Sequence, residues 1–513
     1  MLDLFAKIIS MGIFGMDAFQ VEVEADIAGG LPKFDIVGLP DTAVSEARDR
    51  VRAAIKNNAL KFPSSRITIN LAPADIRKAG PLYDLPILTA ILLASGQIPK
   101  HSTADSAFIG ELSLSGEIRP ASGILPMVLK AAELGLKKIY IPEENRAEGA
   151  VANGIDVYPI HDLKQLIRHL CGEEEITPCE KVDFQSLILD DTALDFCDVR
   201  GQEEAKRALE IAAAGGHNVL MMGPPGSGKS MLAKRLPSIL PPITYEEALE
   251  TSKVYSIRGL LPPGQSLITA RPFRAPHHST SAIGLTGGGT IPHPGELSLA
   301  HNGVLFLDEL PEFNRQAMEC MRQPLEENFI TISRAAGTLS FPCSVMLVAA
   351  MNPCPCGYFG HPTHPCICPE GAPARYLSKV SGPLLDRIDI HIEVPSVEFE
   401  QLTSTKKEES SAAIRERVTR AREIQQHRLE GTGCTCNAKM DSRATRETCR
   451  LTPDAEFMMR QAFDRLDLSA RAYDKLLKIA RTIADLDGST DIEMEHVAEA
   501  VQYRSLDRKL WQA

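Results

Sequence analysis

The sequence lacks a hydrophobic run long enough to cross a membrane. Its longest apolar stretch, Leu85 to Ala94, contains Pro86 and is far shorter than the ~18–20 residues that span a bilayer. The N-terminal segment carries Asp3 and Lys7 and has no small-residue cleavage site after an apolar run, so it is not typical of a signal peptide. We therefore expect a soluble, cytoplasmic protein with no membrane partner.

Disulfide bonds are rare in that compartment, so the 12 cysteines are expected to be free thiols or metal ligands. The chain also shows no internal repeat and no low-complexity segment. Its 44% hydrophobic and 24% charged residues exclude wholesale disorder. The length of 513 residues suggests about three domains.

A net positive charge, which would favour nucleic-acid binding, is also absent, since the formal net charge is -12. The uneven distribution of the negative charge along the chain weakens this argument against DNA binding. Residues 173–198 contain nine acidic residues and one lysine, and therefore carry most of the net charge. A local basic surface elsewhere in the chain stays compatible with this composition.

Hydrophobic patterns divide the chain into four parts. Residues 1–172 alternate strand and helix patterns, which predicts an α/β domain, and residues 173–197 form an acidic linker. Residues 198–396 contain apolar strands typical of a buried parallel sheet, and residues 397–513 have helical patterns. The predicted strands are 19–27, 66–73, 137–142, 217–223, 303–309 and 344–352, and the predicted helices are 42–57, 85–93, 161–170, 410–429, 454–466, 469–485 and 491–503.

A glycine-rich motif, GPPGSGKS, follows the first apolar strand of the second α/β domain and precedes a helix. It matches the phosphate-binding pattern G-x-x-x-x-G-K-[ST]. The backbone N–H groups of such a loop surround phosphate oxygens at a helix N-terminus. Lys229 can reach the β- and γ-phosphates, and the Ser230 hydroxyl can ligate Mg²⁺. The predicted nucleotide-binding residues are Gly223, Pro224, Pro225, Gly226, Ser227, Gly228, Lys229 and Ser230.

Further polar residues follow the next two apolar strands. We expect Asp308 to hold Mg²⁺ through water and Glu309 to orient or deprotonate the attacking water. Asn352 can lie beside the γ-phosphate and position water, although asparagine also ends strands and turns for other reasons. Arg387 and Arg471 come later in the chain. Lone arginines are usually surface residues, but their order after these motifs favours a catalytic role.

Together these motifs resemble the AAA+ ATPases, in the branch of the magnesium chelatase ATPase subunits and MCM helicases. Within it the chain resembles the ComM/YifB family of magnesium chelatase-like competence proteins. Members of that family have segments almost identical to three segments of this chain: residues 273–313, NPCPCGYFG at 352–360 and SGPLLDRIDIHIEVP at 381–395. The resemblance covers essentially the whole chain. It implies an AAA+ core with MCM- and chelatase-type inserts over residues 198–396 and a helical lid over 397–513. It also implies that Asn352 is sensor 1, Arg387 the arginine finger and Arg471 sensor 2.

Residues 110–146 resemble the proteolytic domain of Lon. Lon uses a serine in a G-P-S-A-G turn and a lysine in a G-G-x-K turn. In this chain Leu82 stands at the serine position and Leu125 near the lysine position. Leucine supplies neither a nucleophile nor a base, so the resemblance implies a proteolytically inactive Lon-like fold. A binding or ring-building role is then left for this domain.

Residues 329–341 are predicted to form a strand, a turn and a strand, with Arg334 at the turn. MCM-like ATPases have a pore hairpin at this place, so the resemblance implies that Arg334 contacts the DNA backbone; an ordinary exposed arginine is the alternative. Gly287–Gly289 is a second candidate pore loop. His277 and His278 precede it, and we do not expect them to hold a metal, because adjacent side chains point in different directions.

Cys354, Cys356, Cys366 and Cys368 form two C-x-C pairs. Four thiolates can enclose a tetrahedral Zn²⁺, although C-x-x-C is the commoner spacing and a reduced, proline-rich loop is the alternative. We expect a structural zinc here. A third pair, Cys434 and Cys436, has no obvious partner and stays unassigned.

An arginine finger acts at a neighbouring subunit's γ-phosphate, so the resemblance implies a closed head-to-tail ring, with a hexamer as the family expectation. The implied function is an ATP- and Mg²⁺-dependent DNA motor, acting in branch migration or as a helicase on recombination intermediates during natural transformation. One alternative is a magnesium chelatase-type subunit driving metal insertion, which a Lon-like domain disfavours. Another is a DNA-binding scaffold assembled by ATP, which Glu309 and Arg387 disfavour.

Overall fold

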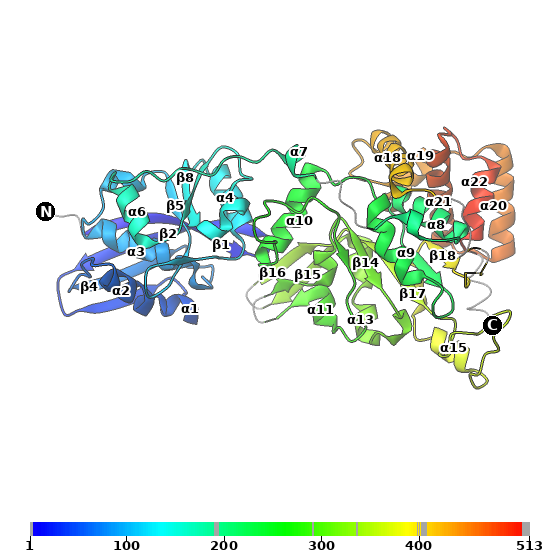
Figure 1. Ribbon diagram of the computed structural model, residues 1–513, viewed down its shortest axis with the longest axis horizontal. Helices are drawn as coiled ribbons and strands as arrows, with labels where there is room; N and C mark the ends of the chain where they lie inside the picture. The colour runs from blue at the N-terminus through cyan, green and yellow to red at the C-terminus, as the bar shows by residue number, and fades with distance from the viewer. Residues whose placement is uncertain are drawn as a thin grey trace. The chain divides into compact units, whose positions relative to one another are not determined.

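The computed structural model describes residues 4–188, 194–289, 292–334, 337–397, 399, 401 and 408–504. Contacts within the chain define two compact units (Figure 1). The first unit comprises residues 1–189, 245–269 and 333–340, and the second comprises residues 190–244, 270–332 and 341–513. Two short segments from the middle of the chain therefore pack with the N-terminal α/β domain.

The first unit contains a seven-stranded mixed sheet in the order β3-β4-β2-β1-β5-β8-β9. β1 and β2 pair antiparallel along their whole length, from Phe5 opposite Asp26 to Phe14 opposite Asp17. Alternate residues of β2 are buried, as the sequence pattern predicts for a half-buried strand. The strands are β1 (Phe5–Phe14), β2 (Asp17–Ala28), β3 (Lys33–Val37), β4 (Arg66–Ala72), β5 (Ser106–Phe108), β8 (Lys138–Pro142) and β9 (Asp156–Ile160), with a small hairpin of β6 (Glu111–Leu112) and β7 (Ile118–Arg119).

The helices of this unit follow the apolar patterns of the sequence. Every residue of α3 (Asp84–Ala94) is buried, which confirms the prediction of a buried helix. The helix predicted over residues 42–57 divides at Glu46 into α1 (Thr42–Ser45) and α2 (Ala47–Asn57). The other helices are α4 (Ile124–Glu133), α5 (Arg146–Gly149), α6 (Leu163–Leu170), α7 (Phe184–Leu187) and α10 (Tyr245–Ile257).

The acidic segment carries apolar residues that pack into the first unit. Cys179 is buried in a cluster with residues of β1, α4 and β9. Phe184 and Leu187 of α7 pack beside Leu125 and Leu267. The segment is therefore held to the first unit by apolar contacts, and its negative charges lie between them.

The second unit contains a five-stranded parallel sheet in the order β11-β14-β17-β10-β18. All residues of β10, β14 and β17 are buried, as expected for strands covered on both faces. The strands are β10 (Val219–Met222), β11 (Phe273–Arg274), β14 (Val304–Leu307), β17 (Met346–Met351) and β18 (Ile390–Glu393). The helices around them are α8 (Glu203–Gly215), α9 (Lys229–Arg235), α11 (Ala282–Thr286), α12 (Glu296–Leu299), α13 (Arg315–Glu319), α14 (Arg322–Glu327), α15 (Ala372–Leu377) and α16 (Gly382–Leu385).

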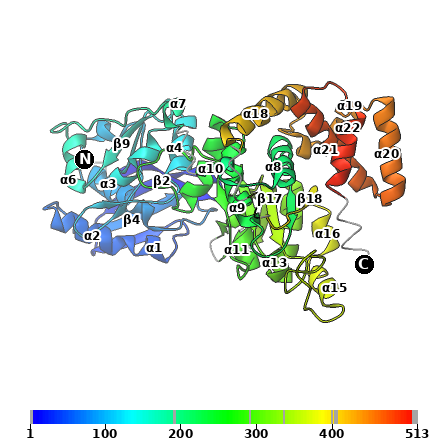
Figure 2. The same ribbon diagram turned by 45° about the vertical axis from the view of Figure 1, so that its right-hand side comes forward.

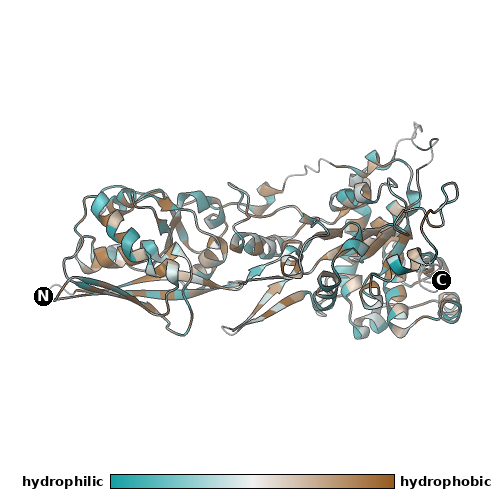
Figure 3. Cartoon of the chain, turned by 90° about the horizontal axis from the view of Figure 1, so that it is seen from below, coloured by the Kyte–Doolittle hydropathy of each residue, from teal (hydrophilic) through white to brown (hydrophobic). Residues whose placement is uncertain are grey.

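Helices form the C-terminal part of the second unit, as the sequence predicts, and Figure 2 shows α18, α21 and α22 near α8. They are α18 (Ser411–Arg428), α19 (Ser442–Thr448), α20 (Pro453–Leu466), α21 (Ala470–Asp487) and α22 (Met494–Gln502). Hydrophilic and hydrophobic residues alternate along many helices, as amphipathic packing requires (Figure 3). Among the helices that the structure describes, none has the length and apolar character of a membrane span.

Candidate nucleotide and metal sites

The glycine-rich loop connects the buried strand β10 to the N-terminus of α9. Gly226 and Gly228 have φ angles of 77° and 92°, which side-chain-bearing residues rarely adopt. A Cβ atom at Gly223 would lie 2.1 Å from the Val394 carbonyl oxygen, so only glycine fits there. The strand, the loop and the helix have the geometry of a phosphate-binding loop.

Lys229 joins this loop to the end of a neighbouring strand. Its Nζ donates hydrogen bonds of 2.8 Å to the carbonyl oxygens of Gly223 and Pro224, and it lies 3.3 Å from Asn352 Oδ1. Burial lowers the pKa of the Lys229 ammonium, an effect that Asp308 opposes. β10 and β17 are adjacent and parallel, which explains why residues that are far apart in sequence meet at one sheet edge.

Ser230 and Asp308 are also in contact. The Ser230 hydroxyl donates a 2.6 Å hydrogen bond to Asp308 Oδ2. A hydroxyl and a carboxylate at this distance supply the oxygen ligands that Mg²⁺ prefers. The next residue, Glu309, has a φ of 52°, and its N–H donates to Asp308 Oδ1 at 3.0 Å. A non-glycine residue in this conformation is often found at functional sites.

His278 lies against Glu309, a contact that the sequence interpretation missed. Its Nδ1 is 3.3 Å from Glu309 Oε2, and its ring lies tilted by 35° against that of His277 with 4.0 Å between centroids. His278 follows β11, which pairs in parallel with β14. The signal in the sequence is the short FR strand before the histidine pair, which is too brief to recognise by periodicity.

The two predicted arginines, Arg387 and Arg471, do not join the other predicted site residues. Arg387 pairs with Glu326 at 2.6 Å and donates to the Arg322 carbonyl at 3.0 Å. In the described part of the chain, its contacts do not include the phosphate-binding loop or the strand-end carboxylates. Arg471 is exposed in the first turn of α21. One chain thus brings together Lys229, Ser230, Asp308, Glu309 and Asn352, but not the two arginines.

A partly buried ion pair attaches α21 to the chain just beyond Arg387. Lys475 Nζ lies 3.0 Å from Asp389 Oδ1, and His217 Nδ1 lies 3.4 Å from Asp389 Oδ2. Burial raises the pKa of the Asp389 carboxyl, but Lys475 and His217 outweigh this effect and hold it far below its usual range. The helix that carries Arg471 is therefore fixed to the strand that follows Arg387, which sequence patterns did not reveal.

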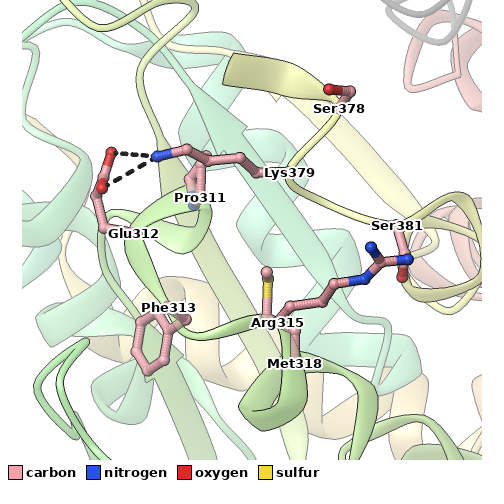
Figure 4. A pocket seen from close by; sticks show the side chains of 8 residues that line it. All are labelled: Pro311, Glu312, Phe313, Arg315, Met318, Ser378, Lys379 and Ser381. Atoms are coloured by element: carbon pink, nitrogen blue, oxygen red, sulfur yellow. Dashed lines mark hydrogen bonds and ion pairs between the residues drawn. The ribbon is translucent and has the colours of Figure 1, made fainter. Parts of the chain in front are cut away.

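A pocket of about 500 Å³ lies beside the end of the carboxylate-bearing strand (Figure 4). Lys379 and Glu312 form an ion pair of 3.3 Å across one side of it. The other lining residues are Pro311, Phe313, Arg315, Met318, Ser378 and Ser381. None of the predicted nucleotide-binding residues lines this pocket, so it is separate from the phosphate-binding loop.

The four cysteines of the two C-x-C pairs converge. Their Sγ atoms all lie within 4.8 Å of one another, and they form the one such group found among the described residues. The backbone N–H groups of Tyr358 and Ile367 favour the charged thiolate and lower the pKa of Cys356 to about 6. The third pair is apart from them: Cys436 is buried, and the Cys434 thiol contacts the Lys439 carbonyl at 3.3 Å.

β15 (Phe329–Arg334) and β16 (Gly337–Pro342) pair with each other, which confirms the two strands predicted over residues 329–341; residues 335–336, where the turn is predicted, lie outside the described structure. Arg334 ends β15, and its side chain lies outside the described structure. The Gly287–Gly289 segment enters a smaller hairpin, in which β12 (Gly287–Gly288) pairs with β13 (His293–Pro294). Both candidate pore elements therefore include short paired strands.

The two Lon-like positions hold apolar side chains. Leu82 is partly buried against two hydrophobic clusters, and Leu125 is fully buried in the first turn of α4. The Leu125 N–H lies 3.2 Å from the Glu148 carboxylate, which also accepts hydrogen bonds from Asn145 and Ser256. Burial raises the pKa of Glu148, against these hydrogen bonds. The Ser256 hydroxyl is therefore held in a buried network of hydrogen bonds around Glu148.

Three protein-family models match the chain. "Subunit ChlI of Mg-chelatase" matches residues 23–145, "Magnesium chelatase, subunit ChlI" matches 195–402, and "Magnesium chelatase, subunit ChlI C-terminal" matches 408–504. The last two models cover the parallel-sheet part and the C-terminal helices. The first covers part of the N-terminal domain.

Curated relatives match nearly the whole chain. Competence protein ComM of Haemophilus influenzae is 43% identical over 513 residues, with 98% of each chain covered. The uncharacterized protein YifB of Escherichia coli is 43% identical over 497 residues, with 97% of this chain and 96% of YifB covered. A shorter similarity, 26% over 160 residues, is to Lon protease 1 of Hydrogenovibrio crunogenus; it covers 29% of this chain and 19% of the protease.

Proposed function

The chain belongs to the ComM/YifB family of magnesium chelatase-like AAA+ proteins, and from this premise we propose that it is an ATP-hydrolysing ring that moves DNA. The task we propose is branch migration or helicase activity on recombination intermediates in natural transformation. The similarity to a relative named as a competence protein supports that task. The site geometry supports the ATPase part independently of any relative.

The observation that carries the proposal is the meeting of Ser230 with Asp308 and of Lys229 with Asn352. A phosphate-binding loop and two strand ends together supply a cation for phosphates, oxygen ligands for Mg²⁺ and an amide near the reacting phosphate. Ser230 and Asp308 would hold Mg²⁺, which when bound would neutralise charge on the β- and γ-phosphates. Glu309 takes the proton from the attacking water, and the backbone N–H groups of residues 223–230 hold the phosphates.

The active sites of the proposed ring lie between subunits. Arg387 contacts α14 of its own chain and not the nucleotide residues of that chain. It is therefore assigned to the γ-phosphate of a neighbour, and Arg471 to a sensor of the bound nucleotide. Head-to-tail contacts of this kind close into a ring, for which we propose six subunits.

DNA contacts are assigned to the hairpin that carries Arg334 and to the Gly287–Gly289 loop. An arginine at a hairpin tip can follow a phosphate backbone without recognising bases.

We further propose the division into a proteolytically inactive Lon-like domain (1–172), a linker (173–197), an AAA+ core (198–396) and a helical lid (397–513). The four clustered thiols are proposed to hold a structural zinc ion.

ATP turnover measured with and without single-stranded and branched DNA tests the proposal. We expect DNA to stimulate hydrolysis by the wild type. No stimulation by any DNA would refute the DNA motor but would not contradict ATP hydrolysis.

The second candidate function is metal insertion into a porphyrin, which the names of the three matching models favour. Because one of them covers residues 23–145, the N-terminal domain does not separate the candidates; a porphyrin-dependent, DNA-independent ATPase would select metal insertion.

A further inference from the structure

The four-cysteine cluster has the dimensions of a tetrahedral zinc site. The Sγ–Sγ distances are 3.3 Å from Cys354 to Cys356, 3.7 Å from Cys354 to Cys366 and 3.6 Å from Cys356 to Cys366. A tetrahedron with Zn–S bonds of about 2.3 Å has edges of about 3.8 Å. All four cysteines are free, so no disulfide explains their approach.

The segment that carries these cysteines, residues 352–371, has little else to hold it in place. It contains no helix or strand, and residues 359–370 include no buried residue. Ile367, between two of the cysteines, is 84% exposed. A segment without a hydrophobic core commonly depends on a bound metal for its structure. We name residues 352–371 the cysteine knuckle.

The cysteine knuckle lies directly on the nucleotide site. Cys354 is fully buried two residues after Asn352, whose side chain contacts Lys229. Gly357 has a φ of 86°, and a Cβ atom there would lie 2.3 Å from Pro225 Cδ in the phosphate-binding loop. The turn at Gly357 is closed by a 2.9 Å hydrogen bond from its N–H to the Cys354 carbonyl. One turn of the knuckle therefore touches both a cysteine and the loop.

We propose that the four thiolates bind one Zn²⁺ per chain and that the metal-bound knuckle, through Gly357 on Pro225, holds the phosphate-binding loop and Asn352 in the nucleotide-binding arrangement. This inference rests on the nucleotide-binding part of the proposed function and is independent of DNA. Metal binding fixes the Cys354 end of the turn, and the packing at Pro225 transmits that order to the loop. Loss of the metal should then weaken nucleotide binding.

The first experiment measures zinc. Elemental analysis of the purified full-length protein should give about one zinc per chain. Cys366→Ser and Cys368→Ser should each reduce that content severalfold. Cys434→Ser is the matched control, since Cys434 belongs to a C-x-C pair outside the cluster, and it should keep the full content. A wild-type protein purified without chelators that contains no zinc and takes up none when zinc is added would overturn the metal site.

The second experiment measures the coupling in wild type, which avoids any misfolded variant. Affinity for a fluorescent ATP analogue is determined before and after 1,10-phenanthroline treatment, with Mg²⁺ in excess, and again after adding zinc. Affinity should fall by about fivefold or more, the lower end of typical coupling between sites, and return with zinc. Equal affinity with and without zinc would overturn the coupling.

Two glycine substitutions distinguish the effect of contact with the phosphate-binding loop from the effect of backbone strain. Gly357→Ala places a methyl group against Pro225, whereas Gly360→Ala meets no atom within 4 Å, although both glycines have positive φ. Gly357→Ala should keep its zinc and lose nucleotide affinity about fivefold, while Gly360→Ala should match wild type in both. Equal affinities would overturn the role of the Gly357 contact. Zinc-dependent nucleotide binding without DNA stimulation would refute only the DNA motor, so the two proposals fail separately.

Discussion

Arg387 and Glu326 form a 2.6 Å ion pair within one chain. The Arg387 side chain is 12% exposed and the Glu326 side chain 51% exposed. Only the Glu326 side of the pair is open to water, because Arg387 is mostly buried and also donates to two backbone carbonyls. To act at a neighbour's γ-phosphate, as proposed, the guanidinium must exchange Glu326 and the carbonyl oxygens of Arg322 and Pro383 for the more concentrated negative charge of the phosphate.

Arg387 should act on the site of a neighbouring subunit. Arg387→Ala and Glu309→Gln subunits should each be nearly inactive alone, because one lacks the finger and the other lacks the base. Mixed rings should recover hydrolysis, up to about a quarter of the wild-type rate if subunits mix at random and each interface works alone. ATPase assays across mixing ratios measure this. Mixed rings that are shown to form and show no recovery would contradict shared sites.

Glu309→Gln should separate binding from hydrolysis. The carboxylate acts on the attacking water, so turnover should fall by about 100-fold or more while ATP binding and ring assembly persist. Lys229→Ala should instead weaken ATP binding by about tenfold or more, because a hydrogen bond between charged groups contributes about 1.5–3 kcal/mol. Single-turnover ATPase and nucleotide-binding assays distinguish the two effects.

Glu312→Gln is the control for Glu309→Gln. Glu312 lies three residues further along the chain and pairs with Lys379 at 3.3 Å. It should leave turnover within about twofold of wild type, since surface ion pairs contribute little. Near-normal turnover by Glu309→Gln, or an equal loss in both variants, would show that Glu309 is not the base.

The meeting of Lys229 with Asn352 and of Ser230 with Asp308 could be predicted because it depends on local sequence. Apolar strands that end in Asp308 and Asn352, and a glycine-rich loop before Lys229, place their side chains at one sheet edge whenever the strands are parallel. The convergence of the four cysteine thiols was predictable for a similar reason, since the short spacings in the sequence limit how far the thiols can separate. Neither prediction required knowledge of distant packing.

Contacts that depend on tertiary packing were not predictable. His278 reaches Glu309 from a two-residue strand, and Lys475 reaches Asp389 from a helix that begins 81 residues later. The segment 245–269 packs with the first unit, where Ser256 bonds Glu148, although it lies between two strands of the second unit. No periodicity in the sequence indicates which of two domains a helix will pack against.

The N-terminal domain should not cleave peptides. By the resemblance to Lon, Leu82 stands at the position of the nucleophile and Leu125 near that of the base, and the Ser256 hydroxyl is already bonded to a buried carboxylate. A serine-directed phosphonate probe should label no residue of the native protein, and peptide substrates should remain intact. Proteolysis by the pure protein that disappears on mutation of one serine in residues 1–170 would refute this expectation.

Arg334 should bind DNA without regard to base sequence. It ends the strand β15 of a hairpin between β14 and β17, which carry Asp308 and Asn352 at their ends. A change at the nucleotide can therefore reach the hairpin through a short path. Arg334→Ala should reduce DNA affinity modestly and flatten its salt dependence by about 0.7–0.9 unit for each phosphate that the arginine neutralises in the wild type.

ATPase and branch-migration assays at several salt concentrations test this role. Basal ATPase without DNA should change little in Arg334→Ala, while DNA stimulation and strand movement should fall together, whatever the base sequence. Arg334→Lys should retain most of both, because binding a phosphate needs charge more than shape. Arg443→Ala, which removes an exposed arginine paired with Glu447 on α19, is the matched control and should behave as wild type. If Arg334→Ala keeps full stimulation and movement, the hairpin is not part of the DNA mechanism, and the Gly287–Gly289 loop becomes the element to test next.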